Sequence, residues 1–443
     1  FDVFKRNEPK IQETLSDVHS SFTIKNSVFE NIKTHKKILQ FGCNFNGNYF
    51  DDSMIDITSC SSARLEDLNF TLDDDSIVVK IESSNDTQIT NCRYDSGEEA
   101  PTQTIAEISN TEIYINSFIF DFTNLSRSQY LTSPILDLNA QSQKFSSHIS
   151  ISVFNSKLGS TDDDKNFGGI IRSNNYDLKI VDTTIDTINL DQYASKCYIF
   201  NCGYSDDLVT AVSIENSVFT NTKAANFTLK VDDLLSIENS QFEGFAGSLF
   251  SIEGKEPSNT KVNMNNVTFS KGSGYPLRTA EWKTSENNFY GCTFEQIDGI
   301  ALFFESGTSS VTECQFCNNT NHQLKASAIY AIGTLSLTIR DCNFTGNAGE
   351  YFGGALLINA TDVQISDCSF VENTCKKHNE EEDDKAKGGA MYLFQISSFN
   401  LTNCNFTQNS ADTDGGAIFI QYRKVQSEGG RPLPNNDYVS LQL

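Results

Sequence analysis

The sequence predicts an all-β protein, a single-stranded parallel β-helix in which the chain winds through short strands joined by bends. Three observations predict this fold. An alternation of apolar and polar residues recurs about every 22 to 28 residues. Each copy loses its phase at one position, usually Asn, Asp or Gly. A large apolar residue, most often Phe, follows three positions later.

The repeat is clearest in residues 337–358, LTIRDCNFTGNAGEYFGGALLI. Leu337 and Ile339 alternate with polar residues, as in a half-buried strand. Asp341 stands where the next apolar residue is due, and the alternation resumes one residue late at Phe344. Such a slip requires a bend with one residue in the left-handed region, which Asn, Asp and Gly tolerate best.

If the first apolar residue is numbered i, the bend falls at i+4 and the large apolar residue at i+7. Coils stacked about 4.8 Å apart then form a ladder of like side chains. The expected ladder residues are Phe29, Phe45, Phe70, Tyr94, Phe120, Leu158, Ile185, Phe219, Phe242, Phe269, Phe294, Phe316, Phe344, Phe370 and Phe406. The expected bend residues are Asn26, Gly42, Asp67, Asn91, Ser117, Asn155, Asp182, Asn216, Asn239, Asn266, Gly291, Glu313, Asp341, Asp367 and Asn403. About 15 coils would make a rod roughly 70 Å long.

Leucine-rich repeats share this period, but they need a leucine-dominated pattern that the sequence lacks. We expect residues 1–20 to form an irregular cap or a partial coil and residues 21–425 to form the β-helix. Residues 426–443 are expected to hold a loop and the first strand of a further coil, in a chain that is a piece of something longer.

The formal net charge of −25 argues against nucleic acid and anionic membranes as partners. No apolar run reaches the length of about 18 residues that a membrane-spanning helix needs, so we expect no membrane span. The acidic run at residues 376–387 suits a solvated loop, with a cation site, for example for Ca²⁺, as the open alternative.

The 12 cysteines form two groups. One group occupies i+5 and reads either as buried small hydrophobes or as disulfide partners on adjacent coils; its members are Cys43, Cys92, Cys292, Cys314, Cys342, Cys368 and Cys404. The other group lies in bends or loops. There we expect two disulfides, Cys197 with Cys202 and Cys317 with Cys375, as an oxidising compartment would allow.

Three segments carry a family resemblance. Residues 344–347, 370–373 and 406–409 read Phe-x-x-Asn, and Gly-Gly-Ala follows at 353–355, 388–390 and 415–417. These motifs resemble the FxxN and GGAI repeats of the polymorphic outer-membrane protein family, over about the last third of the chain. The resemblance implies the pectin-lyase-like, right-handed form of the β-helix and a surface-displayed adhesin or passenger domain.

Catalytic motifs are absent from the sequence. Polysaccharide hydrolases of this fold need carboxylates grouped on one face, but the acidic triplets at 73–75 and 162–164 fall in separate loops. The five histidines share no position in the repeat, and no phosphate-binding, dinucleotide or zinc motif is present. We therefore expect no enzyme, no catalytic or metal-binding residue and no cofactor.

Glycosylation is the modification that the sequence favours. The candidate N-x-S/T acceptors are Asn69, Asn85, Asn124, Asn226, Asn318, Asn343, Asn359, Asn400 and Asn405. Asn69, Asn343 and Asn405 fall at i+6, which points outward. Asn266 also heads such a motif, but it falls at the bend and is predicted to carry no glycan.

These features favour a secreted or cell-surface structural or adhesive glycoprotein that associates with itself or with other surface proteins. An open β-helix end favours stacking into a filament or surface coat. Two alternatives stay open. One is a polysaccharide lyase or glycoside hydrolase of the pectin-lyase-like class. The other is a carbohydrate-binding module that uses exposed aromatic residues such as Tyr204, Tyr275 and Trp282.

Overall fold

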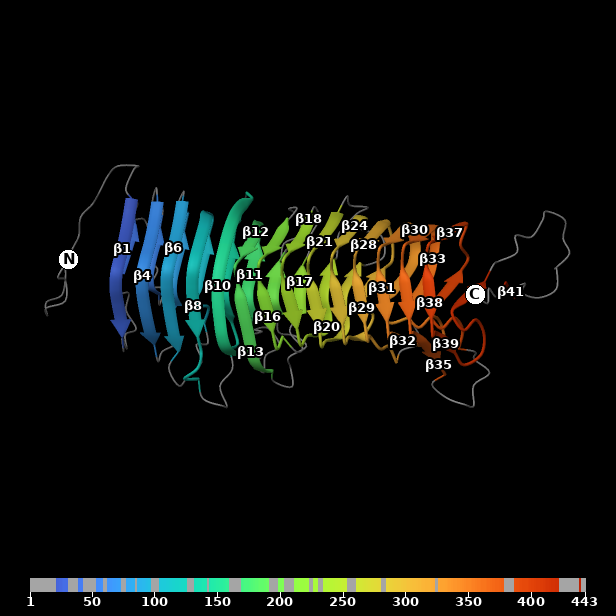
Figure 1. Ribbon diagram of the computed structural model, residues 1–443. Helices are drawn as coiled ribbons and strands as arrows, with labels where there is room; N and C mark the ends of the chain where they lie inside the picture. The colour runs from blue at the N-terminus through green and yellow to red at the C-terminus, as the bar shows by residue number, and fades with distance from the viewer. Residues whose placement is uncertain are drawn as a thin grey trace, which may run out of the picture.

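A computed structural model describes the fold. It covers residues 21–30, 39–42, 53–58, 62–72, 77–83, 86–96, 103–125, 131–141, 143–158, 169–190, 198–202, 211–222, 226–229, 234–252, 260–279, 284–322, 326–377, 386–421 and 438–439. Every regular element in these ranges is a β-strand, which confirms the all-β prediction for this part of the chain. Figure 1 shows the strands stacked along one long axis, in chain order from blue to red.

Two columns of strands make up one large sheet, and almost all of its pairings are parallel. The first column starts with β1 (Ser21–Glu30), β4 (Ser62–Leu72), β6 (Asp86–Ser96), β8 (Glu112–Asp121) and β10 (Phe145–Leu158). It continues as strand pairs divided by a bend: β12 (Tyr176–Val181) and β13 (Thr184–Leu190), β15 (Val212–Glu215) and β16 (Val218–Thr220), β18 (Leu234–Glu238) and β19 (Gln241–Glu243), β21 (Thr260–Asn265) and β22 (Thr268–Ser270), β24 (Thr284–Tyr290) and β25 (Thr293–Glu295), β28 (Thr308–Thr312) and β29 (Gln315–Cys317), β30 (Ile329–Arg340) and β31 (Asn343–Thr345), β33 (Leu356–Ser366) and β34 (Ser369–Val371), and β37 (Ser398–Thr402) and β38 (Asn405–Thr407).

The second column also receives the N-terminal parts of β30 and β33. Its other members are β2 (Leu39–Gly42), β3 (Ser53–Thr58), β5 (Ile77–Glu82), β7 (Ala106–Ser109), β9 (Pro134–Asn139), β11 (Gly169–Asn174), β14 (Tyr198–Cys202), β17 (Asn226–Leu229), β20 (Ala246–Ile252), β23 (Ser273–Thr279), β26 (Asp298–Gly299), β27 (Leu302–Phe304), β36 (Met391–Phe394) and β40 (Ile418–Gln421). A separate three-stranded sheet holds β32 (Ala348–Glu350), β35 (Thr374–Lys376) and β39 (Ser410–Ala411). Each strand pairs with its counterpart one repeat later, which is the solenoid arrangement of a parallel β-helix.

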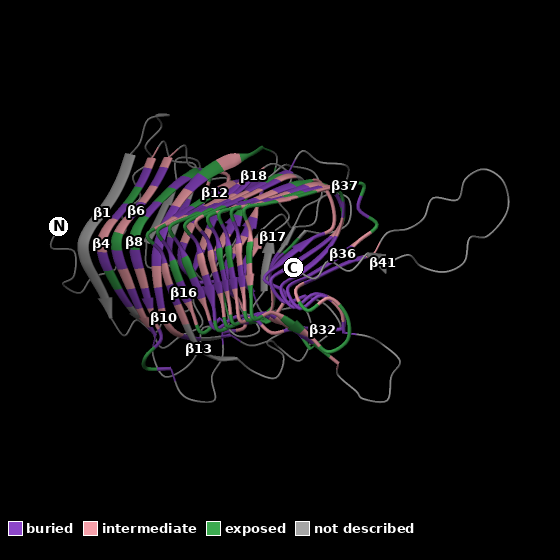
Figure 2. Ribbon diagram, turned by 45° about the vertical axis from the view of Figure 1, so that its right-hand side comes forward, coloured by how far each residue is buried: buried purple, intermediate pink, exposed green. Residues whose placement is uncertain are grey.

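A phenylalanine ladder runs through the core, as predicted. Neighbouring rings lie 4.7 to 5.3 Å apart between centroids and within 12° of parallel. Its members are Phe219, Phe242, Phe269, Phe294, Phe316, Phe344, Phe370 and Phe406. The spacing matches the distance between paired strands, so backbone pairing alone brings each ring onto the next. Figure 2 shows the buried residues along the strands.

The predicted bends adopt the left-handed conformation, with φ between 48° and 62°. These residues are Asp67, Asn91, Ser117, Asp182, Asn216, Asn239, Asn266, Gly291, Glu313, Asp341, Asp367 and Asn403. Neighbouring bends also pair through their side chains: Asn266 Nδ2 donates to Asn239 Oδ1 at 2.9 Å, and Asn403 Nδ2 donates to Asp367 Oδ1 at 3.1 Å. Ser117 and Glu313 adopt the same conformation, so the fold imposes this geometry on residues that do not favour it.

The predicted ladder is wrong in one coil. Val153, and not Leu158, pairs with Phe120 on one side and Ile185 on the other. The register of β10 shifts at its bend, where it has one residue fewer than β8. Because this corner is one residue shorter, the repeat pattern predicts the bend at Asn155, which is the wrong residue. Asn155 is left-handed (φ 59°), but it belongs to a different set of bends, two residues after the ladder.

A correction also applies to the coil predicted around Gly42 and Phe45. Gly42 ends β2 and pairs with Thr58 in the second column, while Phe29 pairs directly with Phe70. No ladder position therefore separates Phe29 from Phe70, and Phe45 itself lies outside the described residues.

The C-terminal segment also differs from its prediction. The short strand β41 (Tyr438–Val439) pairs antiparallel with β40, through Val439 with Ile420. The pairing of these two residues is antiparallel, and the rest of the strand that the sequence predicts for a further coil is not described. Residues 1–20 and 440–443 lie outside the described part of the chain.

The second column of bends lies two residues after the ladder and was not predicted from the sequence. Its residues have φ between 53° and 70°: Asn155, Asn221, Gly244, Lys271, Gln296, Asn318, Gly346, Glu372 and Gln408. Lys, Gln and Glu have no special tolerance of this conformation. Five of the nine residues are Asn or Gly, which favour this conformation, and the other four are not, so composition marks only part of the column.

The Asn of each Phe-x-x-Asn motif lies inside the stack and forms a directional hydrogen-bonded column. Asn347 Nδ2 donates to the Phe316 carbonyl of the preceding coil at 2.9 Å and to Asn373 Oδ1 of the following coil at 3.0 Å. The Asn347 backbone N–H also donates to Asn373 Oδ1, at 3.1 Å. Asn319 and Asn373 repeat this pattern, and neither is exposed to solvent. Because every buried amide is paired, the column adds no unsatisfied polar group to the core.

The Gly-Gly pairs bring successive coils into backbone contact. Gly353, Gly388 and Gly415 have φ of 68°, 71° and 64°. A Cβ atom on the following glycine, Gly354, would lie 2.1 Å from the carbonyl oxygen of Gly389. Only glycine fits at this position, which explains the repeated pair.

A second apolar cluster lies on the outward face of the second column. It is built on in-register residues of successive coils and is almost fully buried: Phe303, Tyr330, Leu357, Tyr392 and Phe419. Ile300 also belongs to this cluster, and Phe352 packs against it. Both faces of these strands are therefore covered, which explains why their sequences are continuous apolar runs.

We expect Asn373→Asp to destabilise the protein in a pH-dependent way. The new carboxylate would have oxygen atoms facing the Phe344 carbonyl and Asn409 Oδ1, which now accept hydrogen bonds from Asn373 at 2.9 Å each. Burial raises the pKa of such a carboxyl above its unfolded value, so stability is greatest at low pH and falls as the pH rises through the raised value.

Urea denaturation between pH 4 and 8 measures this effect. Asn343→Asp is the matched control, because Asn343 is exposed on the neighbouring strand. A similar pH dependence in both variants would contradict the buried column.

Candidate functional site

A column of three glycines forms the floor of a surface pocket. Gly247 of β20, Gly274 of β23 and Gly299 of β26 pair in register. Their φ angles are 79°, 100° and 152°. A Cβ on Gly274 would lie 2.4 Å from the Gly247 carbonyl oxygen, and one on Gly299 would lie 1.9 Å from that of Gly274. The floor is therefore bare backbone, and the side chains beside it form the walls.

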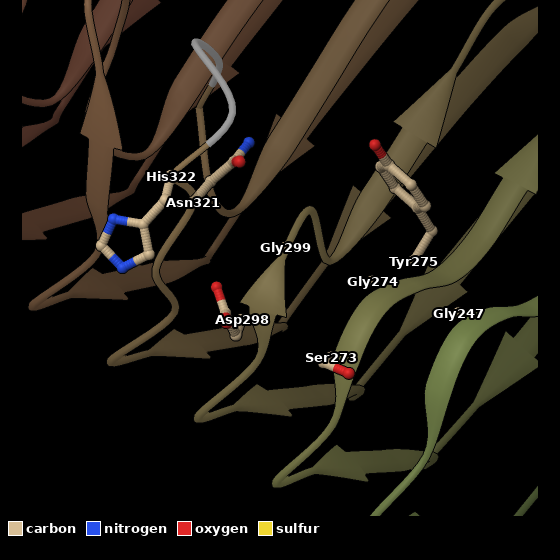
Figure 3. A pocket seen from close by; sticks show the side chains of 8 residues that line it. All are labelled: Gly247, Ser273, Gly274, Tyr275, Asp298, Gly299, Asn321 and His322. Carbon is tan, nitrogen blue, oxygen red and sulfur yellow. The ribbon is translucent and has the colours of Figure 1, made fainter. Parts of the chain in front are cut away.

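The pocket has a volume of about 290 Å³. Its lining residues are Gly247, Ser273, Gly274, Tyr275, Asp298, Gly299, Asn321 and His322. Figure 3 shows His322 and Asn321 on one side, Tyr275 on the other, and Asp298 between them. The volume is near the lower end of the range for small-molecule sites, so it suits a ligand about the size of one sugar ring.

The polar wall of the pocket combines the carboxylate of Asp298, the imidazole of His322 and the side-chain amide of Asn321. His322 Nδ1 lies 3.2 Å from Glu350 Oε1, and the His322 side chain is 69% exposed while that of Glu350 is 10% exposed. Asn321 is 3% exposed, and its Nδ2 donates to the Ala326 carbonyl at 3.0 Å. Asp298 is exposed. Glu350 thus orients His322, and Asp298 supplies hydrogen-bond acceptors at the pocket mouth.

Tyr275 is the aromatic wall and the one proposed sugar-binding aromatic that the structure describes; Tyr204 and Trp282 lie outside the described residues. Its ring lies 5.9 Å from that of Phe303, on the edge of the outward apolar cluster. Arg278 stacks on the Phe303 ring, 5.3 Å from its centroid. Tyr275 is half-buried and lines the pocket.

Most of the described ladder cysteines are buried thiols. Cys292, Cys314, Cys342 and Cys368 are buried and follow one another along the stack. Burial raises the pKa of Cys92, in an equivalent position, to about 11. A thiol with such a pKa is protonated at neutral pH and is a poor nucleophile or metal ligand.

The predicted disulfide between Cys317 and Cys375 is not formed. Both residues are free thiols. Cys317 pairs with Thr345 in the first column, whereas Cys375 pairs with Gly349 in the three-stranded sheet, so the chain holds them on different walls of the stack. Burial raises the pKa of Cys375 to about 12. Cys197 lies outside the described residues, as does the side chain of Cys202.

Most of the described glycosylation candidates are exposed. These are Asn69, Asn124, Asn318, Asn343, Asn400 and Asn405. Asn359 is half-buried, with its Nδ2 3.4 Å from Gln395 Oε1. Asn85 and the side chain of Asn226 are not described. Asn266 is exposed, but its Nδ2, the atom that would carry a glycan, donates to Asn239.

The pocket was not predicted from the sequence, although a signal for it is present. Gly247, Gly274 and Gly299 each follow a ladder phenylalanine by five residues, in three successive coils. In the described ranges, no group of three or more His, Cys, Asp or Glu residues is suited to hold a metal ion. The acidic triplets at 73–75 and 162–164 and most of the run at 376–387 lie outside these ranges.

Comparisons with known proteins give no family for this chain. No family model matches it, and no curated protein matches it. One solved structure with some likeness is the ORF18 protein of Geobacillus virus E2, with a TM-score of 0.18 and 8% identity. The aligned part covers 76% of this chain and 53% of the viral one, so this chain spans about half the length of that protein. No helix among the described residues is long and apolar enough to cross a membrane.

We expect Gly274→Ala to be strongly destabilising, because the new methyl group would meet the Gly247 carbonyl oxygen at 2.4 Å. Gly291→Ala is the matched control. Gly291 is also left-handed, at φ 62°, but the nearest atom to its added methyl group is 4.0 Å away. We expect the control variant to lose only about 1 to 2 kcal/mol of unfolding free energy, which is the cost of the left-handed conformation for a residue with a side chain.

Urea denaturation of both variants measures the difference in the free energy of unfolding. Equal losses would mean that the glycine column is not packed backbone to backbone.

Proposed function

We propose that this chain is an extracellular structural or adhesive rod, displayed on a cell surface or built into a filament or coat. The observation that supports it most is the uninterrupted ladder, in which each coil contacts only its neighbours. Such a body offers length, stiffness and a large side surface.

The finer classification belongs to this proposal. We propose a right-handed, pectin-lyase-like β-helix of about 15 coils, with repeats like those of polymorphic outer-membrane proteins. Its support is that Phe, Asn and Gly-Gly-Ala recur in fixed structural roles: stacked ring, buried amide and backbone contact. Folds of this kind serve many functions, so the site must be argued separately.

Surface chemistry supports an extracellular location. The exposed acceptors at Asn69, Asn343 and Asn405 lie on outward positions of the first column. The net charge of −25 favours solubility and disfavours binding to nucleic acid.

Secretion from eukaryotic cells followed by glycopeptide mass spectrometry tests this proposal. We expect glycans on Asn343 and Asn405 and none on Asn266, whose Nδ2 is engaged with Asn239. Retention of the chain inside the cell, or a glycan on Asn266 with Asn343 and Asn405 unmodified, would count against it.

A second candidate function is saccharide binding, favoured by the pocket. Tyr275 offers a ring face for stacking, while Asp298 and the backbone floor offer acceptors for hydroxyl groups. The carboxylates of Asp298 and Glu350 disfavour acidic sugars. The ligand class is therefore a neutral saccharide.

We expect Tyr275→Ala to weaken binding of neutral oligosaccharides by about tenfold or more, because the stacking face is lost. Tyr290→Ala is the control, since Tyr290 is 49% exposed and is not among the lining residues. Titration calorimetry on ligands selected from a glycan panel measures both. Equal loss in both variants would place the sugar elsewhere, and release of cleaved products would favour the enzyme alternative.

A further inference from the structure

The glycine floor of the pocket is closed at one end by a side chain. The floor position after Gly299 falls at Asn321, because Asp298 pairs with Thr320 in the next coil. Asn321 is 3% exposed, and its Nδ2 donates to the Ala326 carbonyl at 3.0 Å, which holds the amide in place. A ligand that lies along the floor therefore ends at Asn321.

The space beside this end wall matches a single sugar ring. Tyr275 and His322 line the pocket from coils two apart, which places their backbones about 10 Å from one another. Ile300 occupies the same position in the coil between them, but it is 1% exposed and belongs to the outward apolar cluster. The gap between the two side chains is therefore one coil wide, in agreement with the pocket volume of about 290 Å³.

The closed end presents hydrogen-bond acceptors. Glu350 Oε1 lies 3.2 Å from His322 Nδ1. Because a carboxylate can only accept, Nδ1 carries the hydrogen of the neutral imidazole, and the other ring nitrogen, Nε2, is an acceptor. Asp298, which Figure 3 shows beside His322, adds carboxylate oxygens. No Lys or Arg is among the lining residues, so this end favours a ligand group that donates.

Terminal and internal residues of a glycan differ in this respect. A terminal ring carries a free hydroxyl group where an internal ring carries a glycosidic ether oxygen. The hydroxyl group donates, whereas the ether oxygen only accepts and would face His322 and Asp298 without a hydrogen. Acceptors that are desolvated and left unpaired cost binding free energy, and sites built for a hydroxyl group reject analogues that lack it.

We propose that the pocket binds the terminal residue of a neutral glycan, with a free hydroxyl group of that ring donating to His322 Nε2 and Asp298. The inference rests on the saccharide binding proposed above, because it names the part of the saccharide that this pocket takes. Asn321 prevents the glycan from continuing along the floor, and Glu350 is a positioning residue that acts through His322.

Ligand-observed NMR titrations of the whole chain test this proposal. The first probes are the methyl glycosides of glucose, galactose, mannose and N-acetylglucosamine. For the sugar that binds, two trisaccharides follow, one with that sugar at the non-reducing end and one with it only in the middle. We expect the second trisaccharide to bind about tenfold or more weakly than the first, because its ring lacks the donating hydroxyl group.

His322→Ala removes one acceptor from an exposed position and should lower this preference to about threefold or less. His148→Ala is the matched control. His148 stacks on Tyr114 in the first column and does not line the pocket, so its loss should leave the preference unchanged. Circular dichroism checks that both variants fold.

Equal binding of the two trisaccharides, or equal effects of the two histidine substitutions, would overturn the inference and leave saccharide binding in place. Binding of oligosaccharides without binding of any methyl glycoside would also overturn it, since it would show recognition of more than one ring. Absence of binding by every probe at millimolar concentrations would overturn the saccharide function as well, so the two failures are distinguishable.

Discussion

Register is the constraint on which the rest of this structure depends. Parallel pairing at one fixed position per coil forces each side chain to lie about 4.8 Å from its counterpart. Each interior position must therefore hold a residue type that can pack against a copy of itself. Phe does so by stacking, Asn by donating to the next amide, and glycine by bringing backbones into contact. Charged residues do not, which explains their exclusion from these interior columns.

The same constraint accounts for the pocket. Where glycine recurs in one column, at Gly247, Gly274 and Gly299, side chains are missing in a line and a groove follows. The candidate binding pocket is thus a local interruption of a regular stack and needs no separate domain.

Much of this fold could be predicted from sequence, because its signal is periodic. Asp341 interrupts an alternating pattern, and that interruption marks the left-handed corner in coil after coil. Prediction failed where the period itself changes. The bend in β10 has one residue fewer than its neighbour, so Asn155 was taken for the corner and Leu158 for the ladder residue that is in fact Val153. It also failed at Lys271 and Gln296, which adopt left-handed corners that only the packing imposes. The pocket was not predicted because the three glycines, five residues beyond the ladder, have no reactive or binding side chains. The Cys317–Cys375 disulfide was predicted wrongly because the spacing of the two residues in the sequence does not show that they lie in different sheets.

Distances between exposed positions of one column test the register most directly. Gln241, Asn343 and Asn405 lie on the outward face and belong to one in-register column. Spin labels on non-natural residues at these positions, measured in pairs by electron–electron double resonance, should give separations that grow by about 4.8 Å per coil, or roughly 19 Å from Gln241 to Asn343 and 29 Å from Gln241 to Asn405. Separations that do not increase in proportion to the number of coils would contradict the stacked register, and with it the rod.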